Sequence, residues 1–298
     1  MQTCSEIREI LAGAGLSPNK RLGQCFMIDK NLLGKVLALA DPGGDRTVLE
    51  VGPGTGTLTE ELLTRAGRVA AVELDHGLAD VIRMRFADRE NFVLVEGDVL
   101  AGKHALSPAV KAELGLSADL VANLPYSIAT PLIAQCLIES WRAVCGLRED
   151  SVRFDSMTFT VQREVAGRML ADPGGGHYGP ISVLVALLGK GTAGPAIPAS
   201  AFWPAPKIAS RALRIDFDPQ AAGMVDDVAV LSAIVAMAFG QRRKQVGSIF
   251  RRSGGSFDPD LLRSALETAG VDPSSRAERI TPEQFRLLAN AVCAEQGG

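Results

Sequence analysis

No apolar run in the 298 residues is long enough to span a bilayer, which argues against an integral membrane protein. The first residues, Met1 to Glu6, lack the basic and then apolar pattern of a signal peptide, so we expect a cytoplasmic protein without a membrane partner. Signals for disulfides and metals are missing too. The five cysteines contain no CxxC pair and the three histidines form no cluster, so we expect neither a disulfide framework nor a metal site.

An excess of positive charge is also missing, since the net charge is −3. Taken alone, this balance argues mildly against a nucleic-acid partner. One stretch is strongly basic despite the negative net charge. Residues 241–252 include no acidic residue and carry Arg242, Arg243, Lys244, Arg251 and Arg252. Any RNA contact has to use such patches, and the alternative for a charge run is a solvated face.

The segment 48–58, Val-Leu-Glu-Val-Gly-Pro-Gly-Thr-Gly-Thr-Leu, indicates a buried strand followed by a glycine turn. Its three glycines let the backbone turn tightly and approach a ligand. Thr57 and Glu60 have the spacing of a capping box, which predicts a helix from Leu58. A strand, a glycine turn and a helix N-terminus predict a nucleotide-type pocket. The spacing G-x-G-x-G differs from the dinucleotide fingerprint G-x-G-x-x-G, and the loop alone leaves the nucleotide open.

Strands and helices are predicted to alternate from Thr47 onward. The predicted strands are Thr47–Val51, Val69–Leu74, Phe92–Val95, Asp119–Ala122, Met157–Val161, Ser182–Leu188 and Ala212–Phe217. Helix-length segments separate most of them, which predicts an α/β fold with a doubly wound, mainly parallel, seven-stranded sheet. The last two strands lack a full helix between them, which favours one antiparallel edge.

The pattern becomes helical after residue 218. The predicted helices there are Val225–Phe239, Gln241–Arg252, Pro259–Ala269 and Pro282–Ala294. We therefore expect an α/β domain at residues 1–218 and a small all-helical domain at residues 219–298.

Acidic residues follow the second and third predicted strands, on the edge where doubly wound folds bind ligands. Glu73 is placed to accept hydrogen bonds from ribose hydroxyls, and its alternative is a solvated carboxylate. Asp98 could accept from the exocyclic amine of an adenine ring, although by itself it fits a turn aspartate better. Together with the glycine loop, the two acids favour an adenosine site. Asp75 is predicted to cap a helix.

The tetrapeptide Asn123-Leu124-Pro125-Tyr126 follows the fourth predicted strand on the same edge. An amide oxygen and a carbonyl held by a proline can both accept hydrogen bonds from one amino group, and the tyrosine offers a flat surface for a base. Two such acceptors favour pyramidalisation of an exocyclic base amine and stabilise the charge that develops during methyl transfer. The tetrapeptide therefore predicts methylation of a base amine; its alternative is an Asn-Pro turn beside a core tyrosine.

These motifs together resemble the ribosomal RNA adenine dimethyltransferases of the KsgA type, which are related to the erythromycin-resistance methylases. The resemblance covers nearly the whole chain and includes Leu22–Asp29, Glu50–Gly56, Val72–Asp75, Gly97–Asp98, Asn123–Tyr126, Val161–Val165, Tyr178–Gly179, Phe202–Lys207, Phe239–Lys244 and Leu287–Asn290. It implies a Rossmann-like class I methyltransferase fold that uses S-adenosylmethionine (SAM) as methyl donor, without a metal.

The resemblance also implies roles for individual residues. The donor would be bound by Gln24, Cys25, Met27, Gly52, Gly54, Glu73, Leu74, Asp98, Val99 and Asn123. Most members have Asn or His at the position of Cys25, so a side-chain contact there would be lost and a backbone contact would remain. The catalytic set would be Asn123, Leu124, Pro125, Tyr126 and Phe202. Phe202 would pack on the target base opposite Tyr126, and its alternative is a plain core residue. Beside these roles, the basic residues that could contact RNA phosphates are Lys207, Arg211, Arg242, Arg243, Lys244, Arg251 and Arg252, and a solvated charge is the alternative for them.

These roles predict dimethylation of N6 of two adjacent adenines near the 3′ end of 16S rRNA, late in small-subunit biogenesis. The enzyme would act as a monomer on the small ribosomal subunit. Three alternatives stay open at this stage: a resistance-type 23S rRNA adenine methylase, a ribosome assembly factor in which binding matters more than catalysis, and a dinucleotide oxidoreductase, which the glycine spacing disfavours. The segment 141–155 has no functional interpretation.

Overall fold

A computed structural model describes residues 2–19, 21–102, 105–252 and 257–296. The chain divides into two compact units. Unit 1 comprises Met1–Ala166 and Thr192–Phe217, and unit 2 comprises Gly167–Gly191 and Asp218–Gly298. The segment 167–191, which the predicted division at residue 218 assigned to the α/β part, thus groups with the C-terminal helices.

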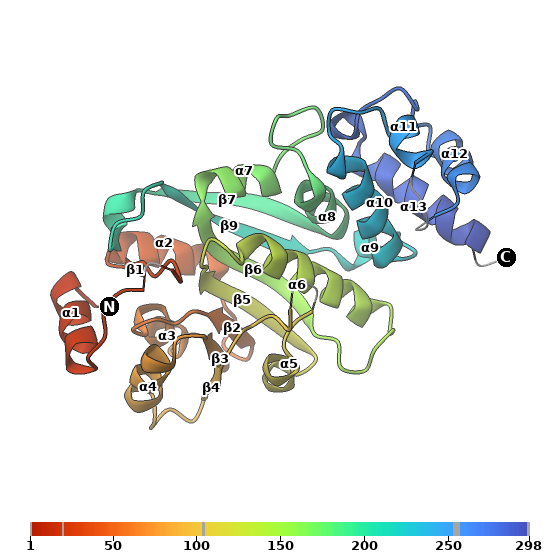
Figure 1. Cartoon of the computed structure of the whole chain (residues 1–298). Helices are drawn as coiled ribbons and strands as arrows, with labels where there is room; N and C mark the ends of the chain where they lie inside the picture. The colour runs from red at the N-terminus through yellow and green to blue at the C-terminus, as the bar shows by residue number, and fades with distance from the viewer. Residues whose placement is uncertain (1, 20, 103–104, 253–256, 297–298) are drawn as a thin grey trace. The chain divides into compact units, whose positions relative to one another are not determined.

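Unit 1 is built around a mainly parallel sheet (Figure 1). Its elements are α1 (Cys4–Gly13), β1 (Phe26–Met27), α2 (Lys30–Ala40), β2 (Thr47–Val51), α3 (Thr57–Leu62), β3 (Arg68–Glu73), α4 (His76–Arg85), β4 (Phe92–Glu96), α5 (Pro108–Leu114), β5 (Ser117–Asn123), α6 (Ala129–Val144), β6 (Arg153–Gln162), η1 (Ala199–Ala201), β8 (Phe202–Trp203) and β9 (Ser210–Phe217). The elements α7 (Arg163–Met169) and β7 (Gly189–Ile197) cross the division between the units.

The seven strands of the sheet follow the order β4-β3-β2-β5-β6-β9-β7. Strands β2, β3, β4, β5 and β6 pair in parallel, and β9 pairs antiparallel with β6. This order confirms the predicted doubly wound sheet and its antiparallel edge. Because the parallel strands end on the same edge, the loops that follow β2, β3, β4 and β5 emerge side by side.

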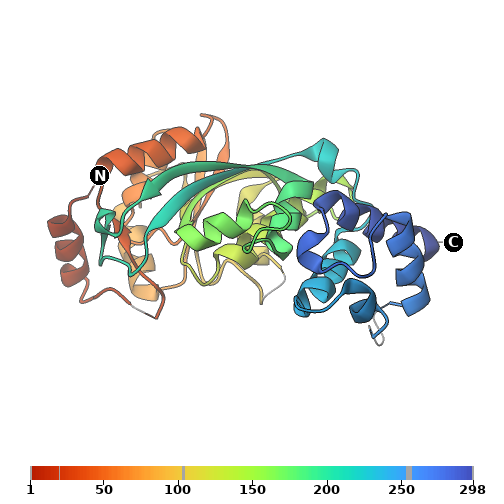
Figure 2. The same cartoon turned by 90° about the horizontal axis from the view of Figure 1, so that it is seen from above.

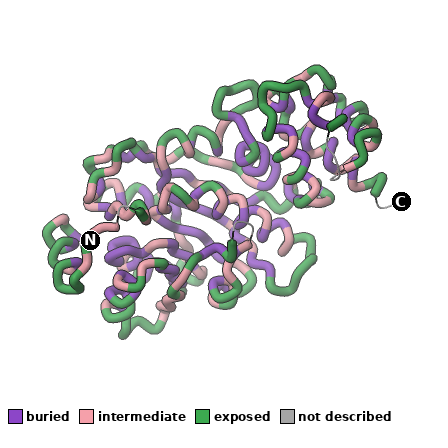
Figure 3. The backbone as a smooth tube through the Cα atoms, in the orientation of Figure 1, coloured by how far each residue is buried: buried purple, intermediate pink, exposed green. Residues whose placement is uncertain are grey.

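Helices cover both faces of the sheet (Figures 1 and 2). α2 packs against β6 and β9 on one face, and α6 packs against β6 on the other. The middle strands are accordingly mostly buried, as the colouring of Figure 3 shows, and most of their residues are apolar; Val48 and Leu49 of β2 have no exposed surface. Such continuous apolar runs are what made these strands predictable.

An ion cluster joins the starts of three strands at the opposite edge. Arg46, just before β2, donates from Nε and Nη2 to Asp119 at 2.5 and 3.0 Å, and from Nη2 to Asp155 at 2.5 Å. Asp119 is buried and also accepts from the backbone and hydroxyl of Ser156. The guanidinium therefore neutralises a carboxylate that burial would otherwise destabilise.

Replacing Arg46 by alanine is expected to lower the free energy of unfolding by about 2 kcal/mol, because Asp119 keeps its burial and loses its counter-charge. Urea denaturation measures this loss. Arg65→Ala is the matched control, since its pair with Glu61 at the end of α3 is solvent-accessible and should contribute less than about 1 kcal/mol. Equal losses in the two variants would refute the argument.

Unit 2 is helical. Its elements are α8 (Pro180–Leu188), α9 (Pro219–Ala222), α10 (Val228–Gly240), α11 (Val246–Phe250), α12 (Pro259–Thr268), η2 (Ala277–Arg279) and α13 (Pro282–Gln296). Aromatic rings form part of its core: Tyr178 contacts Phe239 with ring centroids 5.7 Å apart, and Phe239 contacts Phe285 at 5.8 Å. The Tyr178 hydroxyl donates to the carbonyl of Ile280 at 3.0 Å.

The predicted strand Ser182–Leu188 is wrong, because this segment is helix α8. Its apolar residues are continuous, and such a run fits a buried helix as well as a buried strand. Pro180 at the first turn and Ser182, whose hydroxyl accepts from the backbone N–H of Gly179 at 3.0 Å, favour the helix start. The edge strand β7 follows it and was not predicted, since glycine and proline interrupt its sequence.

Two further local predictions differ from the structure. Only Val246–Phe250 of the predicted helix Gln241–Arg252 is helical, and the basic residues before it lie in a turn. The N-cap of α3 is Gly56 rather than Thr57, so no side-chain capping bond forms there. The Thr57 hydroxyl has a tertiary partner, Gln2, which competes with the local capping geometry.

Among the described residues, no helix is long and apolar enough to cross a membrane.

Candidate active site

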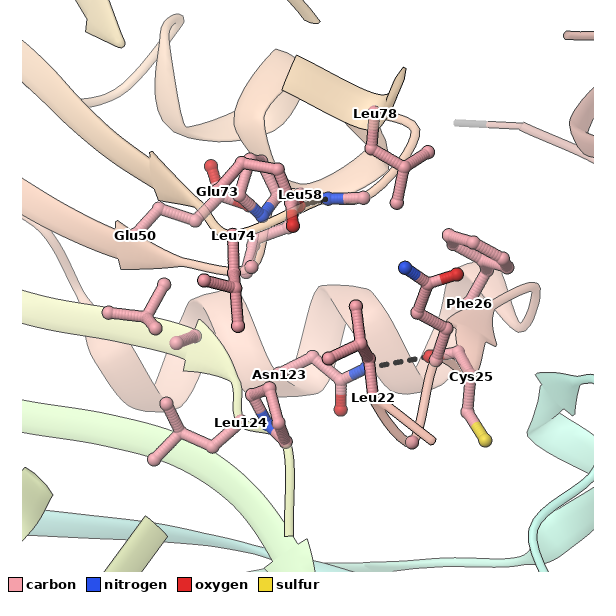
Figure 4. Close-up of a pocket in the computed structure, with 18 of the residues that line it drawn as sticks. Leu22, Cys25, Phe26, Glu50, Leu58, Glu73, Leu74, Leu78, Asn123 and Leu124 are labelled. Carbon is pink, nitrogen blue, oxygen red and sulfur yellow. Dashed lines mark hydrogen bonds between the residues drawn. The ribbon is translucent and has the colours of Figure 1, made fainter. Parts of the chain in front are cut away.

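One pocket of unit 1 collects nearly all of the predicted donor and catalytic residues (Figure 4). Those that line it are Gln24, Cys25, Met27, Gly52, Gly54, Glu73, Leu74, Asp98, Val99, Asn123, Leu124, Pro125 and Tyr126. They belong to the loop and strand around β1 and to the ends of β2, β3, β4 and β5, with the loops that follow. Segments distant in sequence meet here because parallel strands end on one edge of the sheet.

Left-handed glycines shape the turn after β2. The φ angles of Gly52, Gly54 and Gly56 are +71°, +61° and +85°, a region that only glycine occupies without steric cost. A Cβ atom on Gly54 would lie 2.9 Å from the ring of Phe26, which also lines the pocket. The backbone at Gly54 thus lies directly against the pocket wall, and a side chain there would displace that wall.

Glu73 ends β3 and joins the glycine turn to the start of α4. Its Oε2 accepts from the Gly54 N–H at 3.2 Å and its Oε1 from the Asp75 N–H at 3.0 Å. Burial raises the pKa of Glu73, while these two hydrogen bonds act in the opposite direction. Asp75 caps α4, as predicted, by accepting from the Leu78 N–H at 3.2 Å.

Leu74 and Asp98 form a more open part of the pocket. Leu74 has 50% of its surface exposed although it is large and apolar, which suits contact with a flat ring. One oxygen of Asp98 accepts from the Leu100 N–H at 2.9 Å. This contact is typical of a turn aspartate, the alternative considered for Asp98, and the carboxylate lines the pocket as well.

Glu50 is a pocket residue that the sequence argument missed. It lies in β2, is 1% exposed, and its Oε2 has no hydrogen-bond partner among the described residues. Burial raises the pKa of Glu50 to about 8, and the neighbouring Glu73 carboxylate adds to the rise against an opposing effect of Thr59. The sequence did hold a sign of this role, because Glu50 is a charged residue within an otherwise apolar predicted strand.

The raised pKa of Glu50 predicts a pH-dependent loss of stability. The folded protein keeps the proton on Glu50 while the unfolded chain releases it near pH 4.5, so stability falls as the pH rises from that value toward about 8. Glu50→Gln should abolish this fall, and between pH 5 and 7.5 the wild type should lose on the order of 3 kcal/mol relative to the variant.

Urea unfolding at the two pH values measures the difference. Glu149→Gln, at an exposed position, should leave the pH dependence of the wild type unchanged. If the free energy of unfolding of Glu50→Gln changed with pH as that of the wild type does, the folded protein would not keep a proton on Glu50.

The loop before β1 closes one side of the pocket through Gln24. The side chain of Gln24 accepts from the Asn19 N–H at 2.8 Å and donates to Asp75 at 3.1 Å. The neighbouring Cys25 directs its sulfur away from Asn123, whereas its backbone carbonyl accepts from Asn123 Nδ2 at 3.0 Å (Figure 4). This contact is independent of the side chain at position 25.

The Asn123 amide is held at both ends. Its nitrogen donates to Cys25, and its oxygen accepts from the hydroxyl of Thr160, a buried residue of β6. Thr160 also lines the pocket and was not predicted, because only pairing of β5 with β6 places it opposite Asn123. The two partners fix the plane of the amide, so its oxygen has a defined direction.

The predicted aromatic pair does not meet in the pocket. Tyr126 lines it, and the Tyr126 hydroxyl lies 2.9 Å from the Ser210 hydroxyl. Phe202 is 3% exposed and packs in the hydrophobic core, which is the alternative considered for it. Its strand β8 pairs antiparallel with β1, which directs the ring inward. Trp203, the next residue, stacks on Phe26 with ring centroids 6.4 Å apart.

The predicted RNA-binding residues fall in both units. In unit 1, Lys207 is exposed and Arg211 is half-buried. In unit 2, Arg242, Arg243, Lys244, Arg251 and Arg252 are all exposed. Arg242 also has a structural contact, since its guanidinium donates to the Tyr178 carbonyl at 2.6 Å.

The five cysteines are free thiols. Within the ranges that the structure describes, His, Cys, Asp and Glu side chains form no group of three or more that could hold a metal ion.

The sheet order and the pocket at its carboxyl edge define a class I methyltransferase fold. The chain belongs to the ribosomal RNA adenine dimethylase family, whose family model matches residues 15–293.

Relatives named ribosomal RNA small subunit methyltransferase A cover almost the full chain. The one from Magnetococcus marinus is 38% identical over 97% of both chains. The one from Mesorhizobium japonicum is 35% identical over 96% of this chain and 97% of its own.

Two solved structures share the fold. A dimethyladenosine transferase from Plasmodium falciparum has a TM-score of 0.68 and 23% identity, and covers 88% of this chain and 95% of its own. The 23S rRNA methyltransferase ErmE has a TM-score of 0.60 and 23% identity, and covers 90% of this chain and 99% of its own.

Proposed function

We propose that this protein transfers methyl groups from SAM to N6 of two adjacent adenines near the 3′ end of 16S rRNA, as a monomer that binds the small ribosomal subunit. One observation carries the proposal: the glycine turn, Glu73, Asp98 and Asn123–Tyr126 all line one pocket of a chain in this family. Relatives that match the chain over almost its full length are named for methylation of small-subunit rRNA.

The residues of the pocket suit a SAM donor. Gly54 leaves room where a Cβ would meet Phe26, so the backbone can approach the methionine part of a ligand beside Gly52. The buried Glu73 carboxylate is an acceptor for ribose hydroxyls, and Asp98 an acceptor for the adenine amine. Gln24, Met27 and Val99 would complete the donor site, with Cys25 contributing through its backbone.

The tetrapeptide 123–126 suits the acceptor. SAM supplies an electrophilic methyl group when bound. The Asn123 amide oxygen and the Leu124 carbonyl would accept hydrogen bonds from the adenine N6 amine and direct its lone pair at that carbon. Thr160 and the Cys25 carbonyl hold Asn123 before substrate arrives, so little reorganisation is needed. Pro125 restricts the backbone, and Tyr126 would stack on the base.

We propose that the helical C-terminal part, residues 219–298, docks on the ribosomal subunit and that Lys207, Arg211 and the basic residues of 242–252 contact RNA phosphates. A net charge of −3 gives no global attraction to RNA, so these local patches would supply it. Binding would then weaken steeply as the salt concentration rises. Phe202 would reach a target base only after leaving its core position.

Isotope-labelled SAM and purified small subunits that lack the modification test the proposal. Mass spectrometry of the rRNA fragments should find dimethylated N6 on two adjacent adenines of 16S rRNA. Large subunits are assayed in parallel, and methylation of 23S rRNA alone would favour the resistance-type activity. Absence of transfer to either subunit would overturn the proposal.

A further inference from the structure

The side chain of Gln2 contacts the glycine loop from outside the pocket. Gln2 is 5% exposed, and its Nε2 donates to the Thr55 carbonyl at 2.8 Å. Its Oε1 accepts from the hydroxyls of Thr55 at 2.5 Å and Thr57 at 2.9 Å. One amide thus makes three hydrogen bonds, two to Thr55 in the turn after β2 and one to Thr57, the first residue of α3.

The helix that follows Gln2 packs behind the pocket wall. Ile7 and Leu11 of α1 are buried in a cluster with Phe26 and Leu78, and the latter two line the pocket. The guanidinium of Arg8 lies 5.0 Å from the ring centre of Trp203, which stacks on Phe26. The N-terminal segment 2–11 therefore supports both the loop and the facing wall.

A second contact holds the same loop from α4. Arg85 donates from Nη1 to the Thr55 carbonyl at 2.6 Å and from Nη2 to Glu60 at 3.1 Å. The Thr55 carbonyl accepts from both Gln2 and Arg85, so it is fixed from two directions. The glycine loop has a flexible backbone of its own, and these outside contacts restrict it.

We propose that Gln2 is a positioning residue for the methyl donor: it holds the glycine loop, through Thr55 and Thr57, in the conformation that receives SAM. This inference rests on the proposed function, because it takes SAM as the ligand of the pocket. Gln2 acts through the loop. Without its amide, the loop samples more conformations, and SAM has to order it on binding, which lowers affinity without changing the transfer step.

The test compares Gln2→Ala and Gln2→Glu with the wild type by calorimetric titration with SAM and with S-adenosylhomocysteine. We expect Gln2→Ala to raise both dissociation constants about tenfold while kcat at saturating SAM stays within about twofold. Gln2→Glu keeps the acceptors for the two threonine hydroxyls but sets a carboxylate oxygen against the Thr55 carbonyl, so its dissociation constants should rise at least as much as those of Gln2→Ala. Gln220→Ala, at an exposed position of α9, is the matched control and should bind as the wild type does.

Hydrogen exchange of the free proteins gives a readout without ligand. Exchange of the loop amides at residues 54–57 should be faster in Gln2→Ala than in Gln220→Ala, with unchanged exchange in β5 and β6. Wild-type affinity in Gln2→Ala, or a fall in kcat with unchanged affinity, would overturn the inference and leave the proposed function standing. A wild-type protein that binds neither SAM nor S-adenosylhomocysteine would overturn the proposed function and this inference with it.

Discussion

Asn123→Ala is expected to lower kcat for methyl transfer by about 10²–10³-fold, because it removes the oxygen that we propose as an acceptor for the reacting amine. The Thr160 hydroxyl and the Cys25 carbonyl hold the amide in place, so the oxygen needs little reorganisation during the reaction. Affinity for SAM should fall less than about tenfold. The variant loses the hydrogen bond from Asn123 to the Cys25 carbonyl, but the loop before β1 keeps its hydrogen bond from Gln24 to Asp75.

Single-turnover assays on small subunits, with calorimetric titration of SAM, measure the two effects separately. Asn290→Ala is the matched control, because the Asn290 amide also donates to a backbone carbonyl, that of Met224 at 2.8 Å, in unit 2. This control should keep the wild-type kcat. A wild-type kcat in Asn123→Ala would refute the acceptor role. Normal subunit binding by Asn123→Ala without dimethyladenine would separate an assembly role from catalysis.

Glu73→Ala is expected to raise the dissociation constant for SAM by about 100-fold. The carboxylate has two tasks, since it is the proposed acceptor for ribose hydroxyls and also accepts from the N–H groups of Gly54 and Asp75. Its removal leaves these two donors without that partner and loosens the glycine loop, while hydrogen bonds to a charged group are among the stronger ones. Glu73→Gln keeps one acceptor oxygen and should be intermediate.

Titration calorimetry at pH 7.5 measures the loss, with Glu90→Ala at an exposed position before β4 as control. Because burial raises the pKa of Glu73, affinity of the wild type should fall as the pH is lowered through that raised value, when the carboxylate takes up a proton. An unchanged dissociation constant in Glu73→Ala would remove Glu73 from the donor site.

The two variants probe opposite sides of one pocket. Glu73 belongs to the strand beside the glycine loop, and Asn123 to the strand on the other side of β2. Their predicted effects therefore differ in kind: the first acts on affinity for the donor and the second on the rate of transfer.

The meeting of most of the proposed donor-site residues in one pocket was predictable, because it depends on local sequence order. Glu73, Asp98 and Asn123 each follow a predicted strand, and parallel strands bring such positions to one edge without further information. Asp75 could be assigned as a helix cap for the same reason, since capping involves neighbours in sequence.

The errors lie where a local pattern fits two structures. The apolar run 182–188 satisfies a strand and a helix equally, and its place in the core of unit 2 decided for the helix. The role of Phe202 at the target base stays a prediction, because its proline-rich frame fits a pocket edge as well as the core in which the ring packs. Thr57 had capping spacing, yet Gln2 offered its hydroxyl a different partner.

The sequence by itself determined the α/β order, the carboxyl-edge pocket and the family, because these follow from periodicity, glycine spacing and short motifs. Only the tertiary structure decided which further residues form or support that pocket: Thr160 beside Asn123, Glu50 in the pocket lining, and Gln2 on the glycine loop. The physical reason is that these contacts join residues between 37 and 55 positions apart, or depend on burial, and neither is written in a local pattern.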